Sequence, residues 1–386
     1  MRCCVTWSAV PERFSGMRRT KKSSSESARG LRRRSLLVLV AVLLLDFAVG
    51  SWRFDDRTPA ASRFDAAAAA SYDIERVGRI QDDGESARFV LRDGLWRLSE
   101  VSSEMVNVDA TGSRRTVGNR PGGLRVAFVG GSAAFGVGQA DDRTIASELA
   151  RELNADGPVP VEVSNFGSPS WTAVDAARDL RLRLERGERF DVVISYAGAN
   201  ELFMGFLGWS VPDSMVTKAL ELAGTASDNV FEHWADRSVL SRLAGREPRP
   251  DRSPLRVADP SMKIGALMSE AFAEWRDASP EELLLLEQTV RFNYSEGDRM
   301  LSALAEEYGF SILHVVQPLA IDTLPGFISE TRAVLVGSVP EPLDLGARLP
   351  MTCYIDNVHT SEPCSRDIAG FIAAEFRARG LDDVRR

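Results

Sequence analysis

The architecture of this chain follows from one segment, Leu124-Arg125-Val126-Ala127-Phe128-Val129-Gly130-Gly131-Ser132. Apart from Arg125, its first six residues are continuously apolar, which is typical of a strand buried on both faces of a sheet. The two glycines allow a tight turn, and a serine follows them directly. Ligands bind at the carboxyl ends of the strands in open α/β sheets, so the segment predicts that Ser132 faces a ligand-binding site.

Downstream of this segment, apolar strands alternate with helical patterns. The further strands are expected at residues 159–163, 191–196 and 310–316. Helices are expected after Asp141 and Asp142, which are capping candidates, and at residues 174–184 and 368–376. Strands separated by helices predict a three-layer α/β/α sandwich with a central parallel sheet.

Residues 203–290 interrupt this alternation. They hold three tryptophans and a section rich in proline and arginine, and they include Ser279-Pro280-Glu281-Glu282. A serine before a proline at the first helical position is a good start signal for a helix. We interpret this stretch as a helical insertion over the ligand-binding edge of the sheet. A surface elaboration unrelated to substrate is the alternative.

Charge is unevenly divided along the chain. Residues 1–34 carry a net charge of +8, whereas the whole chain of 386 residues carries −8, so the remainder is strongly acidic. An acidic body argues against nucleic acid as a partner, because phosphate binding needs clustered lysine and arginine.

The basic N-terminus leads into an apolar run at residues 35–52. Arginines 32–34 lie directly before the run and predict a cytoplasmic tail at residues 1–34, with everything after the run translocated. The run is expected to be a single-pass transmembrane anchor in a bacterial cell membrane, with a cleaved secretion signal as the alternative. Residues 53–121 are expected to form a tether and an N-terminal extension, and residues 122–386 the main domain.

Two cysteines, Cys353 and Cys364, would lie outside the cytoplasm, where disulfides persist. They bracket Asp356 and His359, so a bond between them would close a small loop around those two residues. Two buried free thiols are the alternative.

A serine nucleophile needs a base, and the chain has three histidines. His233 lies in the predicted insertion, and His314 lies in an apolar strand where a core role is expected. His359 follows Asp356 by three residues, so the carboxylate can turn back to accept from Nδ1–H and leave Nε2 free for Ser132. The predicted catalytic residues are therefore Ser132, Asp356 and His359.

Gly167 and Asn200 each follow a predicted strand, so both should point to the same edge of the sheet as Ser132. A glycine lets its N–H approach an oxyanion, and an asparagine amide donates from its side chain. With the backbone N–H of Ser132, they would form an oxyanion hole. A plain loop glycine and a helix cap are the alternatives for Gly167 and Asn200.

In this order, Ser132, Gly167, Asn200 and His359 resemble the SGNH/GDSL hydrolase family, which is named after these four residue types. The resemblance covers residues 122–380 and implies a flavodoxin-like sandwich, Ser132 as nucleophile, Gly167 and Asn200 in the oxyanion hole, and Asp356 as partner of the base His359. Many members have aspartate where this chain has Gly131, and Gly-Gly-Ser is familiar in membrane-anchored bacterial relatives. The residues after His359 also differ, because Pro363-Cys364 replaces a glycine region.

These features predict an extracytoplasmic serine esterase that cleaves an O-acyl ester, expected to be acetyl, from a carbohydrate or another small ester. No cofactor or metal is implied, because no cluster has ligand spacing. An O-acyltransferase of envelope polysaccharide could use the same triad, with a sugar hydroxyl as acceptor. A non-catalytic carbohydrate-binding envelope protein is the third interpretation.

Overall fold

The computed structural model describes residues 76–80, 89–155, 157, 159–211, 215, 279–320, 327–346, 348–356 and 358–383. All of them belong to the unit formed by residues 56–386. The predicted tail and anchor, residues 53–75 of the predicted tether and extension, and most of the predicted insertion lie outside the described residues. None of the described helices combines the length and the apolar character needed to cross a membrane.

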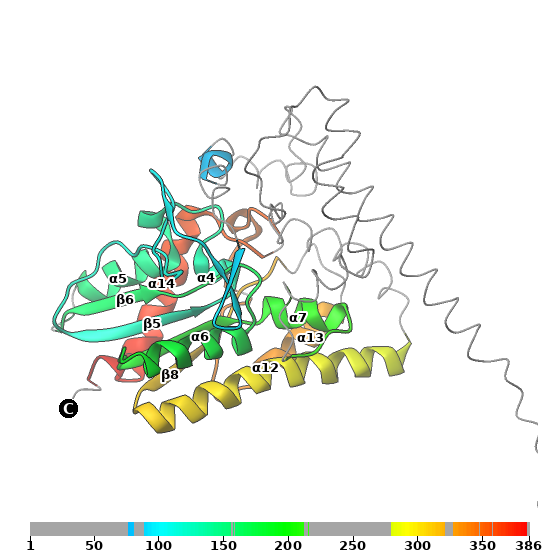
Figure 1. Cartoon of the computed structure of the whole chain (residues 1–386). Helices are drawn as coiled ribbons and strands as arrows, with labels where there is room; N and C mark the ends of the chain where they lie inside the picture. The colour runs from blue at the N-terminus through cyan, green and yellow to red at the C-terminus, as the bar shows by residue number, and fades with distance from the viewer. Residues whose placement is uncertain are drawn as a thin grey trace, which may run out of the picture. The chain divides into compact units, whose positions relative to one another are not determined.

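A five-stranded parallel sheet forms the centre of the described part of the chain (Figure 1). Its strand order is β6-β5-β7-β8-β9. The strands are β5 (Leu124–Gly130), β6 (Val161–Asn165), β7 (Val192–Ala197), β8 (Ser311–Val316) and β9 (Leu343–Asp344). Because β6 and β7 lie on opposite sides of β5, the strand order reverses at β5, and ligands bind at such a switch point.

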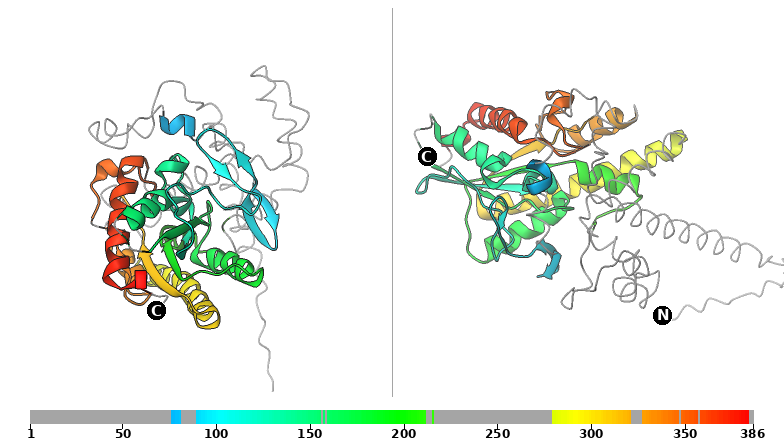
Figure 2. Two further views of the ribbon diagram at one scale, coloured as in Figure 1. Left: turned by 90° about the vertical axis from the view of Figure 1, so that its left-hand side faces the viewer. Right: turned by 90° about the horizontal axis from the view of Figure 1, so that it is seen from above.

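Helices cover both faces of this sheet, as Figure 2 shows. Residues of α5 (Ile145–Ala155) and α14 (Glu362–Ala378) share one hydrophobic cluster with β5, β6, β7 and β8. Residues of α6 (Ala173–Glu185) and α12 (Pro280–Tyr308) pack against the other face. The predicted three-layer α/β/α sandwich is therefore confirmed for the described residues.

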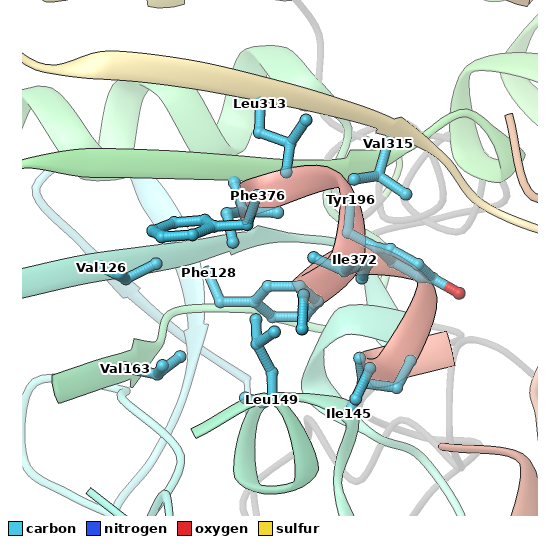
Figure 3. Packing of buried hydrophobic residues seen from close by; sticks show 14 of the residues in the cluster. Val126, Phe128, Ile145, Leu149, Val163, Tyr196, Leu313, Val315, Ile372 and Phe376 are labelled. Atoms are coloured by element: carbon cyan, nitrogen blue, oxygen red, sulfur yellow. The ribbon is translucent and has the colours of Figure 1, made fainter. Parts of the chain in front are cut away.

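Alternation along each strand explains how the sheet feeds both layers. Val126 and Phe128 of β5 point to the face covered by α5 and α14, where Phe128 packs near Tyr196 and Phe376 (Figure 3). Ala127 and Val129 point to the opposite face. Both faces of β5 are thus apolar, which is why its sequence is nearly continuously hydrophobic.

The prediction that Asp141 or Asp142 caps α5 is wrong. Thr144 Oγ1 accepts from the backbone N–H of Ser147, whereas Asp141 lies in a short 3-10 helix, η1 (Asp141–Arg143), and accepts from Arg114 Nε at 3.1 Å. Two further 3-10 helices are η3 (Met351–Cys353) and η4 (Leu381–Asp383).

The helix predicted to open at Ser279 is confirmed as α12. Ser279 accepts from the N–H of Glu282, and the Glu282 side chain accepts from the N–H of Ser279, forming a capping box. At the two ends of the predicted insertion at 203–290, residues 203–206 belong to α7 (Ala199–Phe206) and residues 280–290 to α12, and residues 212–214 and 216–278 between them lie outside the described residues. Both helices share a buried cluster with α13 (Phe327–Val336).

The N-terminal extension packs against the turn that carries Ser132. It forms a hairpin of β1 (Phe89–Arg92) and β2 (Leu95–Leu98), then a second pair, β3 (Val101–Ser102) and β4 (Asn107–Val108). Its apolar side chains share a cluster with Phe135 and Ala140. Phe135 lies in α4 (Ser132–Phe135), the single helical turn that starts at Ser132.

Candidate active site

Ser132 begins α4 immediately after β5 ends at Gly130. Gly130 has φ +154°, and a Cβ there would lie 2.0 Å from the carbonyl oxygen of Tyr196. Only glycine fits this approach of β5 to β7, so the chain can turn sharply and present Ser132. The Ser132 residue is 7% exposed.

The imidazole of His359 lies between Ser132 and Asp356. Its Nε2 is 2.8 Å from Ser132 Oγ, and its Nδ1 is 2.6 Å from Asp356 Oδ2. Since the carboxylate can only accept from Nδ1–H, Nε2 is left as acceptor for the serine hydroxyl, which assigns the tautomer. The structure thus brings together the three residues predicted as catalytic, across 227 positions of sequence.

Asp356 is oriented by its own loop. Its Oδ1 accepts from the backbone N–H groups of Val358 and His359 at 2.8 and 2.7 Å, which leaves Oδ2 for the imidazole. The protein atoms around the half-exposed carboxyl oppose its ionisation, but the His359 ring and these hydrogen bonds outweigh that effect, so the Asp356 pKa lies below its ordinary value. The side chain is 50% exposed, whereas that of His359 is 4% exposed.

Asn200 lies in the first turn of α7, two positions after Gly198, the N-cap of that helix. Its side-chain Nδ2 donates to the carbonyl oxygen of Trp171 at 2.7 Å. A Cβ on Gly131 would lie 2.5 Å from the same Nδ2. The amide is therefore beside the residue that precedes Ser132, and its second hydrogen has no acceptor among the described residues.

Gly167 lies against the turn that carries Ser132, since a Cβ there would be 2.3 Å from the backbone nitrogen of Phe135. Its own N–H donates to Asn165 Oδ1 at 2.9 Å. The Nδ2 group of Asn165 donates to the carbonyl of Ala134 at 3.1 Å. Asn165 thus ties the end of β6 to α4, a role that the sequence did not single out.

The backbone N–H of Ser132 has no acceptor among the described residues. With the second amide hydrogen of Asn200, it gives two donors close to Gly131 that find no acceptor in the described part of the chain. Two such donors close to a nucleophile suit the stabilisation of an oxyanion.

The turn after Ser132 is held by Arg114 of the N-terminal extension. This buried guanidinium donates to the carbonyls of Phe135, Gly136 and Gln139, and it pairs with Asp141. Burial lowers the Arg114 pKa, against the pull of the Asp141 charge. The sequence offers Asp141 only as a capping candidate, whereas the structure shows it buried and paired with Arg114.

A disulfide joins Cys353 to Cys364, with their Cα atoms 5.5 Å apart. The two cysteines enclose Asp356 and His359 in the sequence. Within this loop, the backbone N–H of Ile355 donates to the carbonyl of His359 at 2.9 Å. Asp367 lies close to both sulfur atoms, but a disulfide leaves no thiolate to bind a metal ion.

The other two histidines do not reach this site. His314 lies in β8, where Nε2 is 2.9 Å from Asp298 Oδ1, and burial lowers its pKa. This agrees with the core role expected for it. His233 lies outside the described residues.

Comparison with known proteins finds neighbours among solved structures only: no protein-family model and no curated protein matches the chain. Axe2, an acetylxylan esterase from Geobacillus stearothermophilus, has a TM-score of 0.32 at 14% identity, over 66% of this chain and 94% of that chain. A protein from Parabacteroides merdae described as a GDSL-like lipase has a TM-score of 0.33 at 13% identity, over 69% and 99% of the two chains. The acetyl xylan esterase AlAXEase has a TM-score of 0.26 at 14% identity, over 65% and 99%. At these TM-scores and identities the neighbours assign no family and no residue role, so we assign residue roles from this chain's own geometry.

Proposed function

We propose that this chain is a serine ester hydrolase in which Ser132, His359 and Asp356 act as a catalytic triad. The observation that carries the proposal is the continuous hydrogen-bond path from Ser132 Oγ through the imidazole to Asp356, with distances of 2.8 and 2.6 Å. A serine, an imidazole and a carboxylate connected in this order form the general arrangement of an activated nucleophile.

In the first step, Ser132 Oγ attacks the ester carbonyl while its proton moves to Nε2 of His359. The imidazolium that forms is stabilised by Asp356, which stays ionised because its pKa is lowered. The Ser132 N–H and the Asn200 amide stabilise the oxyanion. His359 then protonates the leaving alkoxide, and an acyl-enzyme remains on Ser132.

Water completes the reaction. His359 takes a proton from the water as it attacks the acyl-enzyme carbonyl, and returns that proton to Ser132 Oγ as the acid leaves. In the acyltransferase alternative, a sugar hydroxyl takes the place of water.

We propose O-acyl esters, with acetyl esters of carbohydrate first among them, as the substrates, and the outer side of the cell membrane as the location. The location is supported by the basic and apolar N-terminus and by the Cys353–Cys364 disulfide, since disulfides persist in oxidising compartments.

The test is hydrolysis of p-nitrophenyl acetate by the purified full chain in detergent, compared with Ser132→Ala. We expect turnover by the parent and a loss of at least about 10³-fold in the variant. A fluorophosphonate probe should label Ser132 in the parent and nothing in the variant. Undiminished turnover by Ser132→Ala would contradict the triad.

Two further outcomes would redirect the proposal. Acylated oligosaccharide formed at the expense of free acid, detected by mass spectrometry, would identify an acyltransferase. A folded parent that neither turns over esters nor reacts with the probe would favour the non-catalytic carbohydrate-binding interpretation.

A further inference from the structure

Besides the bond from its backbone N–H to the carbonyl of Ser168 at 3.2 Å, Trp171 makes two hydrogen bonds to residues far away in the sequence. Its carbonyl oxygen accepts from Asn200 Nδ2 at 2.7 Å, and its indole Nε1–H donates to the carbonyl of Trp96 at 2.6 Å. Trp96 belongs to β2 of the N-terminal hairpin, 75 positions earlier in the chain. One residue therefore joins the hairpin to a predicted oxyanion donor.

Buried charges fix the hairpin on this side of the domain. The Arg97 guanidinium, next to Trp96, pairs with Asp179 of α6 and lies 6.0 Å from the centre of the Trp171 ring. Asp179 also accepts from Arg183 Nε at 2.6 Å. Since removing one partner of a buried ion pair is strongly unfavourable, these contacts hold β2 in one position against α6.

The loop that carries Trp171 is conformationally constrained. Ser170 has φ +65°, in the left-handed region that is unfavourable for a non-glycine residue. Such a conformation persists only where the surroundings hold it. Trp171 is 4% exposed and packs with Phe166 and Leu180, so its ring is held as well as its two hydrogen-bonding groups.

The start of α7 is fixed from the other side. The carboxylate of Glu201, fully buried, accepts from the backbone N–H groups of Ala173 and Gly198. These two bonds hold the start of α7, which carries Asn200, and Ala173, which lies two positions after Trp171. The position of the Asn200 amide then depends on where the Trp171 carbonyl lies.

We propose that Trp171 is a positioning residue for the oxyanion hole, and that the N-terminal hairpin acts on catalysis through it. Anchoring the indole N–H to Trp96 holds the Trp171 carbonyl, and this carbonyl holds the Asn200 amide beside Gly131. Without the hydrogen bond from the indole N–H to Trp96, the loop that carries Trp171 relaxes. The Asn200 amide is then no longer held in position beside Gly131. The inference rests on the proposed ester hydrolysis.

The test is Trp171→Phe, which removes the N–H while keeping an aromatic ring. We expect kcat on p-nitrophenyl acetate to fall about 10–10²-fold, with KM within about twofold, because only the transition state carries the oxyanion. In an Asn200→Ala background the same substitution should change kcat by less than about twofold, since the group that Trp171 positions is already gone.

The matched control is Phe190→Leu. Phe190 belongs to the same buried cluster but precedes β7 at the opposite end of the strand from Asn200. It should lower Tm and leave kcat unchanged. If Trp171→Phe fails to fold, replacing Trp171 by 3-benzothienylalanine keeps the bicyclic shape, removes only the donor, and should give the same kinetic result.

Equal losses of kcat from the Trp171 substitution in the parent and Asn200→Ala backgrounds would overturn the inference, and so would an unchanged kcat. Ser132→Ala separates the two levels. If Ser132→Ala abolishes turnover while Trp171→Phe is fully active, only the positioning role fails. If Ser132→Ala remains active, the proposed function fails and this inference falls with it.

Discussion

The backbone N–H of Gly167 donates to Oδ1 of Asn165 at 2.9 Å. The same N–H is predicted to bind the oxyanion, for which it would have to leave Asn165, whereas the predicted donors on Ser132 and Asn200 have no competing acceptor among the described residues. Asn200 is therefore expected to contribute a larger share of the oxyanion stabilisation. Its side chain is the one donor of the pair that a substitution can remove.

Asn200→Ala should therefore lower kcat by about 10²–10³-fold with little change in KM. Steady-state kinetics on p-nitrophenyl acetate measure this, and thermal unfolding controls for stability. A loss below about threefold in a folded variant would mean that Gly167 exchanges its Asn165 bond for the oxyanion and carries the site.

Asp356→Asn should lower kcat by about 10⁴-fold, because an amide opposite Nδ1 favours the wrong imidazole tautomer. The substitution should also change how the free energy of unfolding depends on pH in the acid range. The folded-state pKa of Asp356 is lowered, so its ionised form contributes stability above the unfolded-state pKa, near 4, and that stability is lost as pH falls through the folded value.

Urea unfolding of the parent and of Asp356→Asn at pH 6 and pH 3 measures the second effect. The stability difference between the two proteins should be smaller at pH 3. A constant difference across that range would show that the pairing with His359 does not lower the Asp356 pKa.

The sequence predicted the sheet well because its strands are buried on both faces. Such strands appear as short, continuous apolar runs, and β5 at Leu124–Gly130 begins within the first predicted run. The polar residues at strand ends could also be predicted, because a serine, an asparagine and a histidine are easily recognised after apolar runs. The short edge strand β9 at Leu343–Asp344 has no such run and was missed.

Residues whose contacts are made with backbone groups or across distant segments left no signal in the sequence. Trp171 positions Asn200 with a carbonyl group, which every residue possesses, and Asn165 holds α4 from a strand end that had been noticed only for Gly167. Arg114 could not be paired with Asp141 in advance, because their contact depends on how a separate N-terminal segment folds back onto the domain. Contacts of that kind are decided by tertiary packing.

Cys353→Ser combined with Cys364→Ser should lower the free energy of unfolding by about 2–4 kcal/mol, because the disulfide restricts the unfolded chain. The double variant should also lose activity, since the bond encloses Asp356 and His359. Dithiothreitol should give the parent the same Tm and the same activity as the variant. Activity that is insensitive to both changes would show that the hydrogen bonds of the loop hold the triad unaided.

Asp175 should make the protein less stable as pH rises through about 4 to 6. Burial raises its pKa to about 6, against hydrogen bonds from Thr172, so the folded state binds a proton that the unfolded state has already released. Asp175→Asn keeps an acceptor for the Thr172 N–H and removes the charge. We compare the change in the free energy of unfolding from pH 4.5 to pH 7.5 in the two proteins. This change should be more favourable to folding in Asp175→Asn than in the parent, by about 1–3 kcal/mol. Urea unfolding at the two pH values measures this, and equal pH dependence in both proteins would contradict it.

Gly131→Ala should lower kcat through a steric clash and not through backbone strain. The backbone of Gly131 has φ −85°, which any residue adopts, but an added Cβ would lie 2.5 Å from Asn200 Nδ2 and 2.9 Å from the Trp171 carbonyl oxygen. The methyl group should break the Asn200–Trp171 hydrogen bond and lower kcat by about 10²-fold. Gly370→Ala, in α14 with open space around the new Cβ, is the matched control and should leave kcat unchanged while raising Tm slightly. In an Asn200→Ala background, Gly131→Ala should cost little more, because the group it displaces is already missing. A full second loss in that background would place the damage at Ser132 itself, since Gly131 is its immediate neighbour.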